Sequence, residues 1–349
     1  MNQAPAAAKD AHADAAVETV ARQVLGNCPH HLFQWPPLAN GEQWTSLDRQ
    51  QAIHTNILKW ATDYHVLPNT KYLSTFLRRY VRMIEEAGEE LDEDLLTFHC
   101  DLMGQGAADT GDLPHDFTLK TYFLDSRVSD NYVTTMESAN TISGGTTGLK
   151  TWPASLSMAE YLLTHPDLIR GKTVVELGSG VGVLGLVCAR LSAARVALTD
   201  VNASVLSVLE KNVDRFRQRT TLPAAPIEIH SLDWFSVEDH EADAHLGDVL
   251  LCADTVYDPD LLPGLAHCLH TFLRAAARRN RPLAVYMATA IRRESTFHDL
   301  NDRLRKVGFA YRIILDDCPP MRFYPDEAVT QIAVLEIVPV SDGTGVGGE

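Results

Sequence analysis

The chain has 349 residues, which is enough for one catalytic domain of about 200 residues and a smaller N-terminal unit. Its composition is 45% hydrophobic, but no apolar run approaches the roughly 18 residues of a membrane-spanning helix, so a membrane protein is not expected. The formal charge of −16 excludes general nucleic-acid binding, which needs clustered lysines and arginines, and it suits a basic or lysine-bearing protein partner.

The first 27 residues are rich in alanine but include acidic side chains. They lack the uninterrupted apolar stretch of a signal peptide, and transit peptides avoid acids, so we expect a flexible N-terminus over 1–27 and a cytoplasmic protein. The six cysteines have neither CxxC nor Cys/His ligand spacing. No disulfide framework and no metal site are therefore expected.

Residues 28–115 are predicted to form a mainly helical N-terminal region. Between 46 and 105, apolar residues recur at the three- and four-residue spacing of a helix face: Tyr72, Leu73, Phe76, Leu77, Tyr80, Val81 and Ile84. Basic residues between them, Arg78, Arg79 and Arg82, form either a solvated face or a surface that binds a partner.

Residues 116–340 are predicted to form the catalytic domain, beginning with two strands between 116 and 138. After a boundary near Gly145, strands and helices alternate, which is typical of a parallel sheet covered by helices on both faces. Strands are expected at 173–177, 195–200, 227–232, 248–254, 283–290, 311–316 and 331–338. Helices are expected at 183–191, 203–219, 260–279 and 295–307.

This order predicts an α/β fold with a Rossmann-like, mostly parallel sheet of seven strands. The last two strands have no predicted crossover helix between them, so they are expected to form an antiparallel edge. Residues 341–349 are expected to be a disordered tail.

The segment VVELGSGVGVLG, residues 174–185, leads from a buried strand through glycines into a helix. Glycines let the backbone approach a ligand closely, and the helix offers unpaired N–H groups, so a nucleotide-like ligand is expected here. The segment also contains GxGxxG at Gly180, Gly182 and Gly185, which fits an NAD-dependent oxidoreductase. Against that alternative, no basic residue between Glu176 and Arg190 is available to bind a pyrophosphate.

Polar and aromatic residues at the ends of the next strands extend this predicted ligand site. Asp200 can accept both ribose hydroxyls of an adenosine, or it can cap the helix that follows. Asp233 can accept from the adenine amine with Trp234 beside the adenine face, although Trp234 also suits a core position. Trp152, ahead of the first helix of the domain, either closes over the cofactor or packs in the core.

The segment CADTVYDP, residues 252–259, follows the fourth strand at the carboxyl edge of the sheet. Asp254 and Tyr257 are expected to face the reacting group there, unless Asp254 only caps the turn. Neither is an obvious nucleophile, which suits methyl transfer because positioning and a deprotonated acceptor then matter most.

In order and spacing, SGGTTGLKTWPASLSMAEYL, ELGSGVGVLG, LDW and ADTVYDP resemble the family-16 seven-β-strand lysine methyltransferases over about residues 120–340. With the predicted hairpin, HLFQWPPL and LPNTKYLSTFL are similar, more loosely, to the branch that methylates a lysine of elongation factor 2. The resemblance implies a protein-lysine N-methyltransferase that uses S-adenosylmethionine and has elongation factor 2 as its protein partner. It departs from the family at the polar stretch 238–247 and at the short link before the third strand.

By this resemblance, Asp254 and Tyr257 belong to a D-x-x-Y segment beside the substrate lysine. The cofactor site is implied to include Trp152, Gly178, Ser179, Gly180, Asp200, Trp234 and Ala253. Three alternatives remain at this point: a small-molecule methyltransferase, an NAD-dependent oxidoreductase, and a scaffold that binds cofactor without catalysis.

Overall fold

The computed structural model describes residues 15–104, 113–114, 116–125, 131–142, 145–219, 222–291, 294–315, 323 and 331–340. The chain divides into two compact units: Met1–Asp112 with Leu119–Tyr132, and Leu113–Thr118 with Val133–Glu349. The expected tail, 341–349, lies outside the described residues.

Helices form the first unit. They are α1 (Ala15–Leu25), α2 (Leu47–Ile53), α3 (Trp60–Asp63), α4 (Thr70–Ala87) and α5 (Glu93–Gly104), with a 3-10 turn, η1 (Ala39–Gly41), and a π-helical segment, η2 (His54–Lys59). Helix α4 begins where Asn69 accepts from the Tyr72 amide at 2.9 Å and ends at Gly88, whose φ is 72°. In its basic face, Arg79 donates to the carbonyl of His30 at 3.0 Å.

The prediction of a flexible segment over 1–27 is wrong for its second half. Residues Ala15–Leu25 form α1, and Val20, Ala21 and Val24 are fully buried in the core of the first unit. The apolar residues of α1 recur at helical spacing, so one face of the helix is buried. A prediction based on alanine content alone overlooks this spacing. Residues 1–14 lie outside the described part of the chain.

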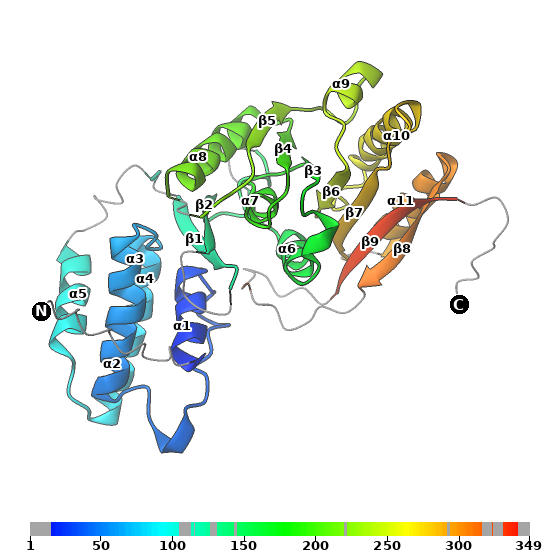
Figure 1. Ribbon diagram of the computed structural model, residues 1–349. Coiled ribbons are helices and arrows are strands. Elements are labelled where there is room, and N and C mark those ends of the chain that lie inside the picture. Colours follow the sequence, from blue (N-terminus) through cyan, green and yellow to red (C-terminus); the bar gives the residue numbers. More distant parts are fainter. Residues whose placement is uncertain are drawn as a thin grey trace, which may run out of the picture. The chain divides into compact units, whose positions relative to one another are not determined.

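The second unit contains a seven-stranded sheet in the order β5-β4-β3-β6-β7-β9-β8 (Figure 1). Its strands are β3 (Thr173–Leu177), β4 (Arg195–Asp200), β5 (Ile227–Ser231), β6 (Val249–Ala253), β7 (Ala284–Ala290), β8 (Phe309–Leu315) and β9 (Ile332–Pro339). Strands β1 (Phe117–Phe123) and β2 (Tyr132–Ser138) pair in a separate two-stranded sheet.

The predicted α/β fold with an antiparallel edge is confirmed. Strands β3 to β7 pair in parallel, whereas β9 pairs antiparallel with both β7 and β8. The chain therefore inserts its last strand between the two that precede it, which makes β8 parallel to β7.

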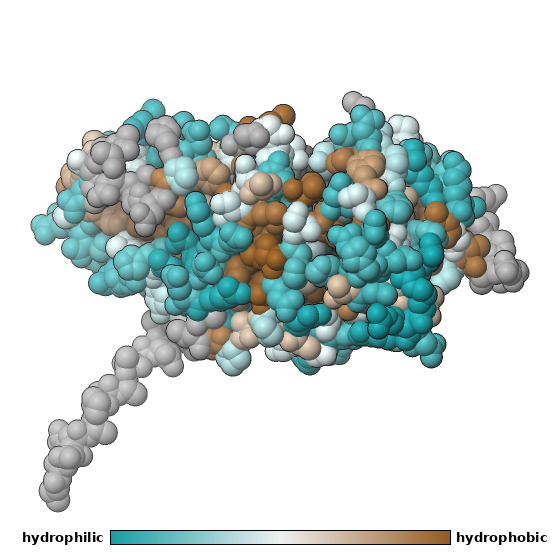
Figure 2. Space-filling model, turned by 90° about the horizontal axis from the view of Figure 1, so that it is seen from above, coloured by the Kyte–Doolittle hydropathy of each residue, from teal (hydrophilic) through white to brown (hydrophobic). Residues whose placement is uncertain are grey.

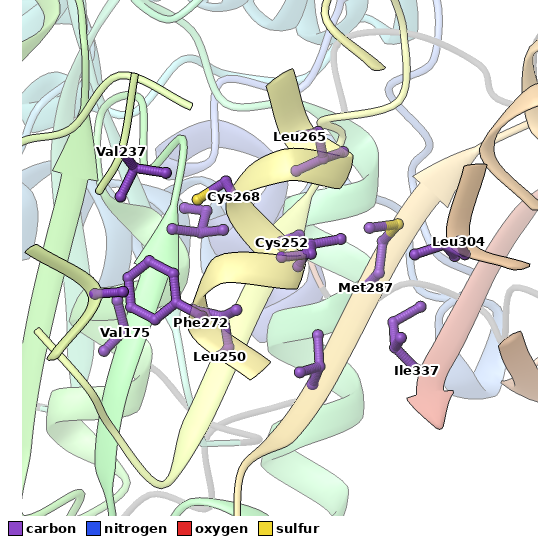
Figure 3. Close-up of a cluster of buried hydrophobic side chains, with 14 of the residues drawn as sticks. Val175, Val237, Leu250, Cys252, Leu265, Cys268, Phe272, Met287, Leu304 and Ile337 are labelled. Carbon is purple, nitrogen blue, oxygen red and sulfur yellow. The ribbon is translucent and has the colours of Figure 1, made fainter. Parts of the chain in front are cut away.

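Helices cover both faces of this sheet. One set is α6 (Pro153–Thr164), α7 (Val183–Arg190) and α8 (Ala203–Arg219); the other is α9 (Asp239–Ala244), α10 (Leu262–Arg278) and α11 (Glu294–Lys306). On the second face, Cys268 and Phe272 of α10 pack against strand residues such as Leu250 (Figure 3).

The surface shown in Figure 2 is mostly hydrophilic, with hydrophobic residues gathered in patches. Within the described residues, no helix is long and apolar enough to cross a membrane.

Candidate active site

A pocket of about 720 Å³ lies in the second unit at the carboxyl ends of β3, β4, β5 and β6. All ten residues that the sequence predicts for the site line it: Trp152, Gly178, Ser179, Gly180, Asp200, Asp233, Trp234, Ala253, Asp254 and Tyr257. Parallel pairing explains their convergence, because strands that run the same way end at the same edge of the sheet.

The glycine-rich loop lets two other segments approach its backbone. Gly178 has φ 68°, and a Cβ atom there would lie 2.9 Å from Cζ2 of Trp234. A Cβ atom on Gly180 would lie 2.9 Å from the carbonyl oxygen of Gly148. Both positions therefore require glycine, and the loop leaves its backbone open to a ligand.

Asp200 and Asp233 also organise the backbone around the pocket. Asp200 accepts from the amides of Gly180 at 3.2 Å and Asn202 at 3.0 Å, and burial raises its pKa. The helix cap considered for Asp200 is supplied instead by Asn202, whose side chain accepts from the Ser204 amide at 2.9 Å. Asp233 is exposed and accepts from the Phe235 amide at 3.0 Å.

Glu137 on β2 is a supporting residue beside the pocket that the sequence analysis missed. It is fully buried, and its carboxylate accepts from the hydroxyl groups of Thr135 at 2.6 Å and Thr151 at 2.7 Å and from the Thr151 amide at 3.0 Å. The next residue, Trp152, donates its indole N–H to the carbonyl of Thr147 at 3.0 Å. Glu137 thus fixes the segment that carries Trp152 into the pocket.

Asn212 on α8 is a second missed residue. Its side chain accepts from the Met136 amide at 2.7 Å and donates to the carbonyls of Met136 at 3.1 Å and Val181 at 2.9 Å. It therefore joins β2 to the glycine-rich loop. An asparagine between the apolar residues Leu209 and Val213 was the available signal, since a fully buried amide needs partners.

Glu176 on β3 is a buried carboxyl group in the lining of the pocket, with its Oε2 atom 2.9 Å from the point where a Cβ atom on Gly185 would be. It is 2% exposed, and its Oε2 atom has no hydrogen-bond partner among the described residues. Burial raises the pKa of Glu176 to about 8. A cationic ligand group beside it, such as the ammonium of S-adenosylmethionine, would favour the ionised form and lower this pKa.

Charge in the pocket favours cations over phosphates. Its described lining includes one basic side chain, Lys150, and four carboxyl groups besides the protonated Glu176: Asp200, Asp233, Asp254 and Asp258. A pyrophosphate would meet repulsion here, whereas a sulfonium or an ammonium ion would be attracted. The donor set thus fits S-adenosylmethionine better than NAD.

Asp254 and Tyr257 differ in exposure. Asp254 is 6% exposed and has φ 52°, so the chain turns through the left-handed region directly after β6. Tyr257 is 45% exposed, and its hydroxyl oxygen accepts from the Thr147 hydroxyl at 3.5 Å. The pocket therefore has a buried carboxyl group within it and a tyrosine at its mouth.

Comparisons with known proteins agree with this geometry. Residues 134–302 match the model of a family described as lysine methyltransferase. The mouse protein-lysine N-methyltransferase EEF2KMT is 29% identical over 281 residues, covering 78% of this chain and 79% of that protein. The protein-lysine N-methyltransferase EFM3 of Chaetomium thermophilum is 28% identical, covering 62% of this chain and 70% of that protein.

Solved structures give a weaker likeness. A putative tRNA (m1A22) methyltransferase of Streptococcus pneumoniae, in complex with S-adenosyl-L-methionine, is 14% identical with a TM-score of 0.38. The match covers 56% of this chain and 77% of that one, and its TM-score is too low to bear on function.

Substituting Gly178→Ala should destabilise the protein more than Gly171→Ala. Both glycines have left-handed φ values, 68° and 69°, so each substitution costs about 1–2 kcal/mol of backbone strain. Only at Gly178 would the new methyl group also strike Trp234, because nothing lies within 4 Å of a Cβ atom on Gly171. Urea unfolding of the two variants measures the difference, and equal losses would contradict the proposed contact.

The raised pKa of Glu176 should make the unliganded protein lose stability as the pH rises. The folded state keeps its proton up to a pKa of about 8, while the ordinary value is 4.5, so the free energy of unfolding falls between these pH values. Glu176→Gln removes this loss. As the pH rises from 5 to 8.5, the variant should therefore gain stability relative to wild type, on the order of 4 kcal/mol.

Thermal unfolding across that pH range measures this gain. Glu210→Gln, a change at an exposed position of α8, is the matched control and should follow the wild-type curve. If the stability of wild type changed with pH in the same way as that of Glu176→Gln, the folded state would not hold a proton on Glu176.

Proposed function

We propose that this chain, whose residues 134–302 match the lysine methyltransferase family model, methylates a lysine side chain of elongation factor 2. The coarser assignment is protein-lysine N-methylation with S-adenosylmethionine as the methyl donor. The finer assignment, elongation factor 2, is supported by the name of the EEF2KMT relatives. The match with this chain covers 80% of the human EEF2KMT. The proposed substrate also implies a cytoplasmic enzyme.

The pocket itself supports a protein substrate over a small molecule. Exposed apolar side chains surround it, with Val201 at 60%, Phe235 at 54% and Tyr257 at 45% exposure. Such a rim, together with the carboxylate-rich interior, can admit a long cationic side chain while the rest of the substrate stays outside. The open rim is the observation that carries the proposal.

Roles for the cofactor-site residues follow from their contacts. We infer that Glu176 accepts from the ammonium group, Asp200 from the ribose hydroxyls and Asp233 from the adenine amine. Trp234 and Trp152 would flank the bound ligand and exclude water. The backbone of the glycine-rich loop, which the residues Ser179 and Gly180 help to form, would contact the cofactor directly.

When bound, S-adenosylmethionine supplies a methyl group on a positively charged sulfur that is already a good leaving group. The chain then has to position the acceptor amine and remove its positive charge. We infer that the carboxyl group of Asp254 accepts a hydrogen bond from the lysine nitrogen, and that Tyr257 guides the side chain at the mouth. These two side chains would hold the amine, once its proton has passed to solvent at the mouth, in line with the bond between the methyl carbon and the sulfur.

Substituting Asp254→Asn should lower turnover about 100-fold while leaving the affinity for S-adenosylhomocysteine within about threefold. Asparagine tolerates a φ of 52°, so this variant removes the charge without the backbone strain that alanine would add. Methyl transfer and calorimetric binding of S-adenosylhomocysteine measure the two effects. An unchanged turnover would exclude a catalytic role for the carboxylate.

Transfer of tritiated methyl groups to purified, unmethylated elongation factor 2 tests the substrate. We expect label on a lysine, located by mass spectrometry, and its absence with Asp254→Asn. Label in other proteins of a hypomethylated eukaryotic lysate but not in elongation factor 2 would retain the lysine methyltransferase and overturn the substrate. Label confined to small molecules would favour the small-molecule alternative.

A further inference from the structure

Thr255 carries a hydroxyl group that the protein leaves without a partner. The residue follows Asp254 directly, after the end of β6, and lines the pocket. Its side chain is only 3% exposed, and its Oγ1 atom has no hydrogen-bond partner among the described residues. A buried hydroxyl in this state costs folding free energy, so its retention calls for a ligand.

Two other buried threonines of the second unit have partners. The hydroxyl of Thr199 donates to the carbonyl of Glu176 at 2.8 Å, and that of Thr271 donates to the carbonyl of His267 at 2.9 Å. These hydroxyl groups serve the fold. Thr255 differs because it lines the pocket and its buried hydroxyl has no acceptor or donor among the described residues.

The neighbours of Thr255 indicate which ligand it meets. Its methyl carbon, Cγ2, lies 3.5 Å from the point where a Cβ atom on Gly178 would be, and Cζ2 of Trp234 lies 2.9 Å from that same point. Thr255 therefore lies on the Trp234 side of the pocket, and the exposed Tyr257 marks the mouth. A substrate lysine enters past Tyr257, so the buried hydroxyl group is better placed for the cofactor.

We propose that the Thr255 hydroxyl group hydrogen-bonds a polar atom of the adenosine part of S-adenosylmethionine, making Thr255 a further cofactor-binding residue. The proposal rests on the assignment of this pocket as the cofactor site. It separates two adjacent roles, since Asp254 serves the lysine while Thr255 serves the cofactor. Adenosine offers both ring acceptors and hydroxyl groups, and a threonine hydroxyl can bond to either kind.

The substitution Thr255→Val tests the proposal because it keeps the shape and removes the hydroxyl. With S-adenosylhomocysteine as the probe, its dissociation constant should rise about three- to tenfold, and Thr255→Ser should recover most of the loss. The unliganded Thr255→Val protein should melt about 2 °C higher than wild type, because an unpaired buried group is gone. A structural hydroxyl would have the opposite effect on melting.

Thr271→Val, on α10 and outside the pocket, is the matched control. It should bind S-adenosylhomocysteine like wild type and should not melt at a higher temperature, since it removes a satisfied hydrogen bond. Unchanged affinity of Thr255→Val for S-adenosylhomocysteine, or a lowered melting temperature of this variant without ligand, would overturn the proposal. The assignment of the cofactor site would still stand if wild type bound S-adenosylhomocysteine. Failure of wild type to bind S-adenosylhomocysteine would instead overturn the assignment of the pocket, and the proposal with it.

Discussion

Parallel pairing of β3 with β4 on one side and β6 on the other is the constraint on which the site depends. The register sets Leu177 beside both Thr199 and Cys252, so the three strands end nearly level. The loops that leave these ends have no sheet partner and are free to take the conformations a ligand requires. Because backbone hydrogen bonds fix the register, the sheet holds the loops in place without relying on ligand contacts.

Buried polar groups in this protein fall into two kinds. Glu137 and Asn212 each have several hydrogen bonds from the chain, and both stabilise the segments that surround the pocket. Glu176 and Thr255, in contrast, have buried oxygen atoms without partners among the described residues. The hydrogen bonds of the first pair hold the backbone around the pocket in place. The second pair, in the lining of the pocket, has oxygen atoms that are left without such bonds.

Charge would let the proposed site serve both a cationic cofactor and a cationic acceptor. The carboxyl groups that line it attract a lysine, yet a lysine must be neutral to accept a methyl group. Proximity to the sulfonium and partial burial would both lower the pKa of the acceptor amine, while the carboxyl groups of the lining would offset repulsion during approach. Attraction and deprotonation are therefore supplied by different parts of one site.

The sequence by itself determined the seven strands and the glycine-rich loop, because strand periodicity and strand-end motifs are local signals, and the family resemblance completed the ten pocket residues. It did not determine α1, whose alanines obscure a buried face, or the insertion of β9 between β7 and β8, since pairing between distant strands leaves no local mark. Glu137 and Thr255 were likewise hidden. Whether a buried polar atom has a partner depends on segments far apart in sequence, so only the tertiary structure decided it.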